Sequence, residues 1–278
     1  MKGFYFGTLQ DIFPVYLPHY KRNDITMNSS YLIIGNWKMK IKDSVQAEHS
    51  FKIISEAAYG LQKSQAVICP SIVHLSNLQS LTHDYCKLGA QDVFWESAGA
   101  YTGMVSAAQI TDAGASYVLL GHSELRALGE TDGMVAKKLS ALAGSKIMPV
   151  VLVGERERDD QGQYIDEVRS QVRAIFSGIE ESVMQKVIIA YEPIWAISTN
   201  ADGRVCTPEQ CAEMVQIIQT ELEVVVPGIH PQYLYGGSAN RDNAQSFLME
   251  GGVSGLVPGS ASLDPDHFVD LLNIAELC

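Results

Sequence analysis

The stretch Ala190-Tyr191-Glu192-Pro193-Ile194-Trp195-Ala196-Ile197 places a single carboxylate at the point where a predicted strand ends. The preceding residues, 187–190, are all apolar and predict a buried strand. Pro193 fixes φ and has no N–H to donate, so the ladder cannot continue past Glu192. Taken alone, this pattern is more typical of a strand that ends in a solvated glutamate. Considered with the rest of the chain, it predicts a base at a strand end, followed by an apolar loop that docks on, or closes over, another part of the molecule.

A short apolar run and a longer helical pattern alternate eight times from residue 31 onward. The predicted strands cover residues 31–35, 66–69, 85–90, 117–121, 147–154, 187–192, 232–236 and 253–258, and the predicted helices lie near residues 44–59, 71–81, 106–113, 132–143, 164–180, 208–223, 240–250 and 265–276. Alternating strands and helices predict a parallel α/β sheet buried on both faces. Eight units in about 250 residues favour a single closed (β/α)8 barrel. A doubly wound open sheet is the alternative, but no G-x-G-x-x-G motif follows the first predicted strand.

Polar residues and glycine-rich turns follow five of the predicted strands. In a barrel these positions meet on one rim, where active sites of this fold lie. The residue types suit a proton transfer on a small anionic substrate, because they include a carboxylate, an imidazole, a lysine and backbone turns that bind phosphate. The residues are Asn36, Trp37 and Lys38; His122, Ser123 and Glu124; Glu192; Tyr235, Gly236, Gly237 and Ser238; and Gly259 and Ser260.

Composition excludes several classes of protein. No apolar run approaches the roughly 20 residues of a membrane-spanning helix, and the formal charge of −12, from 20 basic and 32 acidic residues, argues against nucleic acid or an anionic membrane as partner. Five cysteines without C-x-x-C spacing suggest neither a disulfide framework nor a zinc site, so we expect a reducing cytoplasm. No carboxylate cluster suggests a metal, and no nucleotide fingerprint suggests a redox cofactor.

The first 26 residues stand apart from the repeating pattern of the chain. They contain aromatic residues, two prolines and an aspartate within their only apolar part, so they do not form the clean apolar core of a secretory signal. We expect residues 1–26 to be an N-terminal extension that is disordered, or that precedes a true start at Met27. Residues 27–278 are then the catalytic barrel domain.

Residues 31–278 resemble the triosephosphate isomerase family over nearly their whole length. The resemblance rests on ordered motifs at the family's spacing: Gly35-Asn36-Trp37-Lys38-Met39, Gly89-Ala90-Gln91, Gly99-Ala100-Tyr101-Thr102-Gly103, Gly121-His122-Ser123-Glu124, Gly129-Glu130-Thr131-Asp132, Val153-Gly154-Glu155, Tyr191-Glu192-Pro193-Ile194-Trp195-Ala196-Ile197, Tyr235-Gly236-Gly237-Ser238 and Ala261-Ser262-Leu263. The family is one of cytoplasmic enzymes of glycolysis and gluconeogenesis that need no cofactor.

The resemblance implies a role for each matching residue. Glu192 resembles the family's base, His122 its electrophile, and Lys38 with Asn36 its substrate-orienting pair. The other implied substrate-binding positions are Ser198, Ser238, Gly259 and Ser260. The resemblance also implies that three residues contact the catalytic side chains without touching the substrate, namely Glu124, Tyr191 and Tyr235. The implied lid consists of Pro193, Ile194, Trp195, Ala196, Ile197, Ser198, Thr199 and Asn200, which would close over the phosphate and exclude water.

The implied reaction converts dihydroxyacetone phosphate into D-glyceraldehyde 3-phosphate. Glu192 would remove a proton from the carbon beside the carbonyl and return it to the neighbouring carbon, while His122 polarises the oxygens of the enediol(ate). The family's histidine acts as a neutral imidazole at a helix N-terminus, for which triosephosphate isomerase is the standard example. Residues 123–126 are compatible with such a helix start.

Three positions depart from the family's pattern. The lid usually ends Ile-Gly-Thr-Gly-Lys, but here it reads Ile197-Ser198-Thr199-Asn200-Ala201, with an apparent three-residue insertion within residues 202–206. The last phosphate turn is Pro258-Gly259-Ser260 rather than Val-Gly-Gly, and Leu152 replaces a family cysteine, which we interpret as a core substitution. A longer lid and an altered turn leave open a related isomerase of four-carbon sugar phosphates. A catalytically silent barrel that serves as a binding module is a further alternative, against which the intact Lys38, His122 and Glu192 argue.

The resemblance also implies a homodimer. In the family the loop after the third strand, here residues 91–106, inserts into the neighbouring subunit, with Thr102 reaching toward the partner's site. Two charges expected to pair across that interface are both replaced, by Met104 and by Leu125. We expect these two apolar side chains to meet in the dimer, because a single lost charge would leave the other buried and unpaired.

Overall fold

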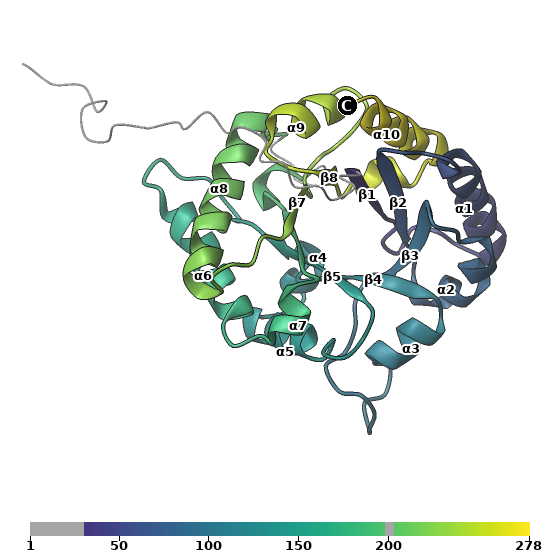
Figure 1. Cartoon of the computed structure of the whole chain (residues 1–278), viewed down its shortest axis with the longest axis horizontal. Helices are drawn as coiled ribbons and strands as arrows, with labels where there is room; N and C mark the ends of the chain where they lie inside the picture. Colours follow the sequence, from purple (N-terminus) through teal and green to yellow (C-terminus); the bar gives the residue numbers. More distant parts are fainter. Residues whose placement is uncertain (1–30, 198–202) are drawn as a thin grey trace, which may run out of the picture.

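The computed structural model describes residues 31–197 and 203–278, and within them the chain forms a closed eight-stranded barrel in the order β1 to β8. All neighbouring strands are parallel, and the pairing of Leu32 in β1 with Gly255 in β8 closes the sheet (Figure 1). The strands are β1 Tyr31–Asn36, β2 Ser64–Cys69, β3 Cys86–Ala90, β4 Ala115–Leu120, β5 Met148–Val153, β6 Ile188–Tyr191, β7 Gln232–Tyr235 and β8 Gly255–Leu256. The predicted (β/α)8 barrel is therefore confirmed, and the open sheet is not formed.

The helices form a ring outside the barrel (Figure 1). Several begin where the sequence supplies a cap: Thr207 and Gln210 form a capping box at the start of α8, and Pro208 occupies its first turn. The helices are α1 Ser44–Ala58, α2 Ile72–Leu78, α3 Ala107–Asp112, α4 Ser123–Ala127, α5 Asp132–Ser140, α6 Gln163–Phe176, α7 Glu181–Met184, α8 Pro208–Val225, α9 Ala244–Glu250 and α10 Pro265–Leu277, with short 3-10 turns η2 Gln79–Leu81, η3 Ile194–Ala196 and η4 Ser260–Ser262.

The strands separate two cores. Ile189 and Tyr191 of β6 face the helices and belong to the large outer cluster, whereas Ile188 and Ala190 face the barrel interior. Because side chains alternate along a strand, Glu192 continues the inward series just beyond the end of β6. The local sequence thus carries the carboxylate to the carboxyl end of the barrel, as predicted.

The predicted element boundaries differ from the structure in a few places. The helix predicted over residues 164–180 ends at Phe176, because Gly178 just beyond it adopts a left-handed φ of +75°, and the separate helix α7 begins only at Glu181. The helix predicted from residue 240 begins at Ala244, after a turn. Residues 194–196, predicted as loop, form the turn η3.

Some predictions lie outside the described residues. They are the extension of residues 1–26 and three positions of the predicted lid, namely Ser198, Thr199 and Asn200. Within residues 31–197 and 203–278, none of the helices combines the length and apolar character needed to cross a bilayer.

Candidate active site

A cavity of about 300 Å³ opens at the carboxyl end of the barrel. It brings together side chains and turns that follow β1, β4, β6, β7 and β8. The predicted site residues that line it are Asn36, Lys38, His122, Glu192, Ser238, Gly259 and Ser260. The convergence expected from the barrel topology is therefore present, although Ser198 lies outside the described residues.

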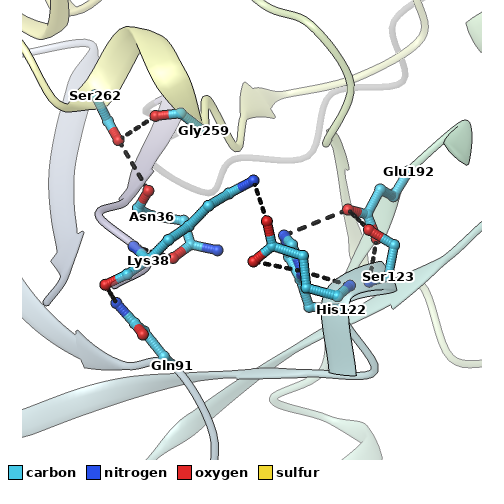
Figure 2. A network of polar contacts seen from close by, with 9 residues as sticks. Asn36, Lys38, Gln91, His122, Ser123, Glu192, Gly259 and Ser262 are labelled. Carbon is cyan, nitrogen blue, oxygen red and sulfur yellow. Dashed lines mark hydrogen bonds and ion pairs between the residues drawn. The ribbon is translucent and has the colours of Figure 1, made fainter. Parts of the chain in front are cut away.

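Glu192 is only 3% exposed, and both of its carboxylate oxygens accept hydrogen bonds. The backbone N–H of Ser123 donates to Oε2 at 2.9 Å, and the Ser123 hydroxyl donates to Oε1 at 2.8 Å (Figure 2). Ser123 lies in the first turn of α4, so this short helix supplies the oriented donors that hold the carboxylate. The sequence places Ser123 on the rim but gives no indication of this contact.

His122 caps α4, and the geometry fixes its tautomer. The backbone N–H of Glu124 donates to Nδ1 at 3.2 Å, so Nδ1 acts as an acceptor and carries no proton. The ring proton therefore belongs to Nε2, which lies 3.4 Å from Oε1 of Glu192. An N–H group next to a carboxylate can donate to the oxygens of a substrate while the carboxylate accepts a proton from carbon.

Lys38 has a strained backbone, with φ at +51°, the only positive φ of a non-glycine residue among residues 31–197 and 203–278. Three side chains hold this conformation. Asn36 Oδ1 accepts from the Lys38 N–H at 3.0 Å, and Ser71 Oγ donates to the Lys38 carbonyl at 3.0 Å. Gln91 Nε2 also donates to this carbonyl, at 2.8 Å (Figure 2). The Lys38 side chain lines the cavity, where its Nζ donates to Glu124 Oε1 at 2.8 Å.

The glycine-rich turns after β7 and β8 also line the cavity. Gly259 lies against Lys38, since a Cβ at Gly259 would be 3.3 Å from the lysine Cε. Ser238 donates from its hydroxyl to the Ala196 carbonyl at 2.8 Å, which ties the turn after β7 to the segment after β6. A lysine beside backbone turns is a suitable site for a phosphate.

A buried carboxylate, Glu155, supports the residues on both sides of Glu192. Its Oε1 accepts from the Tyr191 hydroxyl at 2.8 Å and from Trp195 Nε1 at 2.7 Å, and its carbonyl accepts from the Ile194 N–H at 3.0 Å. Burial raises the pKa of Glu155, and it raises the pKa of Tyr191 well above its usual range. The motif Val153-Gly154-Glu155 places a carboxylate just after the fifth strand, which is the signal that could have identified Glu155.

Three further positions singled out in the sequence lie in or near the site: Tyr235, Glu124 and Leu152. Tyr235 is buried and stacks on Phe247, with ring centroids 3.8 Å apart, and Glu124 contacts Lys38. Leu152, interpreted as a core substitution, is indeed buried in the barrel interior, but it also lines the cavity.

The two positions predicted to meet in a dimer differ in exposure: Met104 is on the surface, whereas Leu125 is half-buried. In the described part of the chain, no three His, Cys, Asp or Glu side chains gather as a metal site.

Comparisons with known proteins agree with this geometry. The family model of triosephosphate isomerase matches residues 31–275. The triosephosphate isomerase of Dictyoglomus turgidum is 36% identical over 246 residues, which cover 87% of this chain and 98% of the relative. The triosephosphate isomerase of Rhodopirellula baltica is 37% identical over 261 residues, which cover 90% of this chain and 99% of the relative. The chain belongs to the triosephosphate isomerase family.

Proposed function

We propose that this chain catalyses the interconversion of dihydroxyacetone phosphate and D-glyceraldehyde 3-phosphate. The observation that carries the proposal is the pair formed by Glu192 and His122, whose Oε1 and Nε2 atoms lie 3.4 Å apart in a cavity that also contains Lys38. A base, a hydrogen-bond donor and a cation around one small cavity are what an aldose–ketose isomerisation of a phosphorylated sugar needs.

The base takes one proton from carbon and later returns it. In our proposal a Glu192 oxygen accepts the proton from the carbon beside the carbonyl, and the C–H electrons move onto the carbonyl oxygen to form an enediol(ate). Nε2–H of His122 gives its proton to the carbonyl oxygen as charge grows there, and the same nitrogen then takes the proton of the neighbouring hydroxyl, so the O–H proton moves from one oxygen to the other. The proton then returns from Glu192 to the adjacent carbon, so no external acid, metal or redox partner enters the balance.

The Ser123 contacts place a condition on this mechanism. Both Glu192 oxygens are held by hydrogen bonds from Ser123, which fix the direction of the carboxylate. Glu192 must therefore give up at least one Ser123 contact when it turns toward the substrate carbon. Lys38 and the turns at Ser238 and Gly259 would meanwhile fix the phosphate, so that binding energy at the phosphate offsets the cost of this rearrangement.

We also propose a cytoplasmic homodimer. All five cysteines are free thiols, as expected in a reducing compartment. An apolar groove beside the base of the loop after β3 is lined by Met39, Ile72, Phe94 and Met104, and Met39 is 92% exposed and Met104 53% exposed in the single chain. Exposed apolar side chains around a groove are typical of a surface that a second subunit covers.

A coupled assay of the purified chain on D-glyceraldehyde 3-phosphate tests the proposed function, with Glu192→Gln as the decisive variant. We expect this variant to fold normally and its rate to fall by a factor of about 10²–10⁴, which is the usual contribution of a general base. The amide retains the size of the carboxylate, and the Ser123 hydroxyl can turn to accept from it. If Glu192→Gln had the melting temperature and the activity of the wild type, Glu192 would not be the base. An inactive wild-type chain would contradict the proposed function.

A further inference from the structure

Leu152 lies between the two reacting side chains in the strand order. It belongs to β5, with β4 leading to His122 on one side and β6 leading to Glu192 on the other. The side chain is 1% exposed, faces the barrel interior and lines the cavity that contains both His122 and Glu192. It is thus part of the wall that a substrate would meet.

Two leucines flank the position beneath Glu192. The inward series of β6 is Ile188, Ala190 and then Glu192, and Ala190 pairs in register with Leu152 of β5 on one side and Leu234 of β7 on the other. Alanine fills little of the space beneath the carboxylate, and of the two leucines beside it only Leu152 lines the cavity. The apolar residues of the interior cluster that line the cavity are Leu152 of β5 and Val257, which follows β8 directly, whereas Ile197, Ala239 and Ala261 come from the surrounding loops and turns.

We propose that Leu152 is a specificity-determining residue that closes the floor of the cavity and limits the substrate to a three-carbon sugar phosphate. The inference rests on the proposed function, because it assumes that the phosphate lies at the turns near Gly259 and Ser238 and that the carbon chain runs from there toward Glu192. A fourth carbon would bring a further hydroxyl against the isobutyl group, where it would lose its hydrogen bonds to water and gain none.

Binding of two probes of different length tests the floor without requiring catalysis. We suggest titration calorimetry with 3-phospho-D-glycerate, which has three carbons, and 4-phospho-D-erythronate, which has four. In the wild-type chain the short probe should bind more tightly. In Leu152→Ala the ratio of the two affinities should shift toward the long probe by about 10-fold or more, the scale of discrimination set by one carbon in an apolar pocket. Leu152→Val should give a smaller shift in the same direction, and Leu152→Met, which conserves volume, should leave the ratio near that of the wild type.

Leu234→Ala is the matched control. Leu234 is 0% exposed and belongs to the same interior cluster, but it comes from β7 and does not line the cavity. It should lower the melting temperature as Leu152→Ala does, with no change in the affinity ratio. An unchanged ratio in both Leu152→Ala and Leu152→Val, an equal shift in Leu234→Ala, or binding of neither probe to the wild type would overturn the proposal. The coupled assay on triose phosphate reports separately on the function.

Discussion

Glu155 shows how one buried residue can support a catalytic group that it does not touch. Its Oε1 accepts from Tyr191 and Trp195, which lie one residue before and three residues after Glu192. Its Oε2 is buried and has no partner among the described residues. The carboxyl group therefore orients the segment around the base, at the cost of burying an incompletely satisfied polar group.

The pH dependence of stability should reveal this cost. Burial raises the pKa of Glu155 above its ordinary value of 4.5. A carboxyl group with a raised folded-state pKa stabilises the fold fully below its ordinary pKa, and that contribution is lost as the pH rises through the raised value. Glu155→Gln keeps an acceptor for Tyr191 and Trp195 and cannot ionise, so its melting temperature relative to the wild type should rise as the pH increases above 4.5, the ordinary pKa of the carboxyl group.

Glu155→Leu is the contrasting variant. It removes the acceptor as well as the charge, so the hydrogen bonds that Glu155 accepts from Tyr191 and Trp195 are lost. We expect it to cost about 1–3 kcal/mol of stability for the buried Tyr191 hydroxyl left unpaired, and to lower activity through displacement of the segment around Glu192. Equal pH profiles for the wild type and Glu155→Gln would show that Glu155 does not titrate differently in the folded state.

The carboxyl ends of β5 and β6 approach each other closely beside the site. Gly154 follows β5 directly, and a Cβ added there would lie 2.0 Å from the Glu192 carbonyl oxygen. Side-chain oxygen and nitrogen atoms of Gln171 in α6 bond the N–H and C=O of Gly154, each at 2.9 Å, so the strand end cannot move away freely. The absence of a side chain at Gly154 is what allows the two strand ends to approach.

Gly154→Ala should therefore displace Glu192. We expect it to destabilise the fold by about 1–3 kcal/mol through overpacking and to lower kcat more than it raises KM, since the base moves while the phosphate turns remain. Thermal melting and steady-state kinetics on triose phosphate measure both effects. Gly133→Ala is the control, because the nearest contact of an added Cβ there is 3.9 Å away. A Gly154→Ala enzyme with wild-type kcat would show that the close approach does not position the base.

At the scale of the whole molecule, the segment between β3 and α3 projects from the barrel (Figure 1). It carries Thr102 and Met104, and Met104 is 53% exposed. Leu125, its proposed counterpart in a second subunit, lies half-buried in α4. In such a dimer α4 would contact the second subunit through Leu125 and hold Glu192 through Ser123. Dimer formation would therefore affect the position of the Glu192 carboxylate.

A double-mutant cycle tests this contact. Met104→Glu alone should weaken the dimer, because it places a charge against an apolar surface, and addition of Leu125→Arg should restore much of the loss through an ion pair. The dimer dissociation constant, measured by sedimentation, is the readout. Additive losses in the cycle would contradict the Met104–Leu125 contact, and a monomeric wild-type chain would contradict the dimer itself.

The local sequence was sufficient for the fold and for the position of the base. Apolar runs that alternate with helical patterns determine the eight βα units, because burial on two faces and the 3.6-residue period are local properties of the chain. The Glu192-Pro193 pair marks the end of β6 for an equally local reason, since proline cannot donate to the ladder. Given a barrel, the motifs that follow the strands must meet on one rim, so they identified the residues that line the cavity.

Only the tertiary structure decided how those residues are held and what surrounds them. Ser123 bonds Glu192 across 69 residues, and Glu155 bonds Trp195 across 40. The same is true of the contacts from Ser71 and Gln91 to the strained Lys38, and of the position of Leu152 in the cavity wall. Such contacts depend on barrel closure, strand register and the volumes of neighbouring side chains, which are properties of the assembled sheet and not of any one segment of sequence.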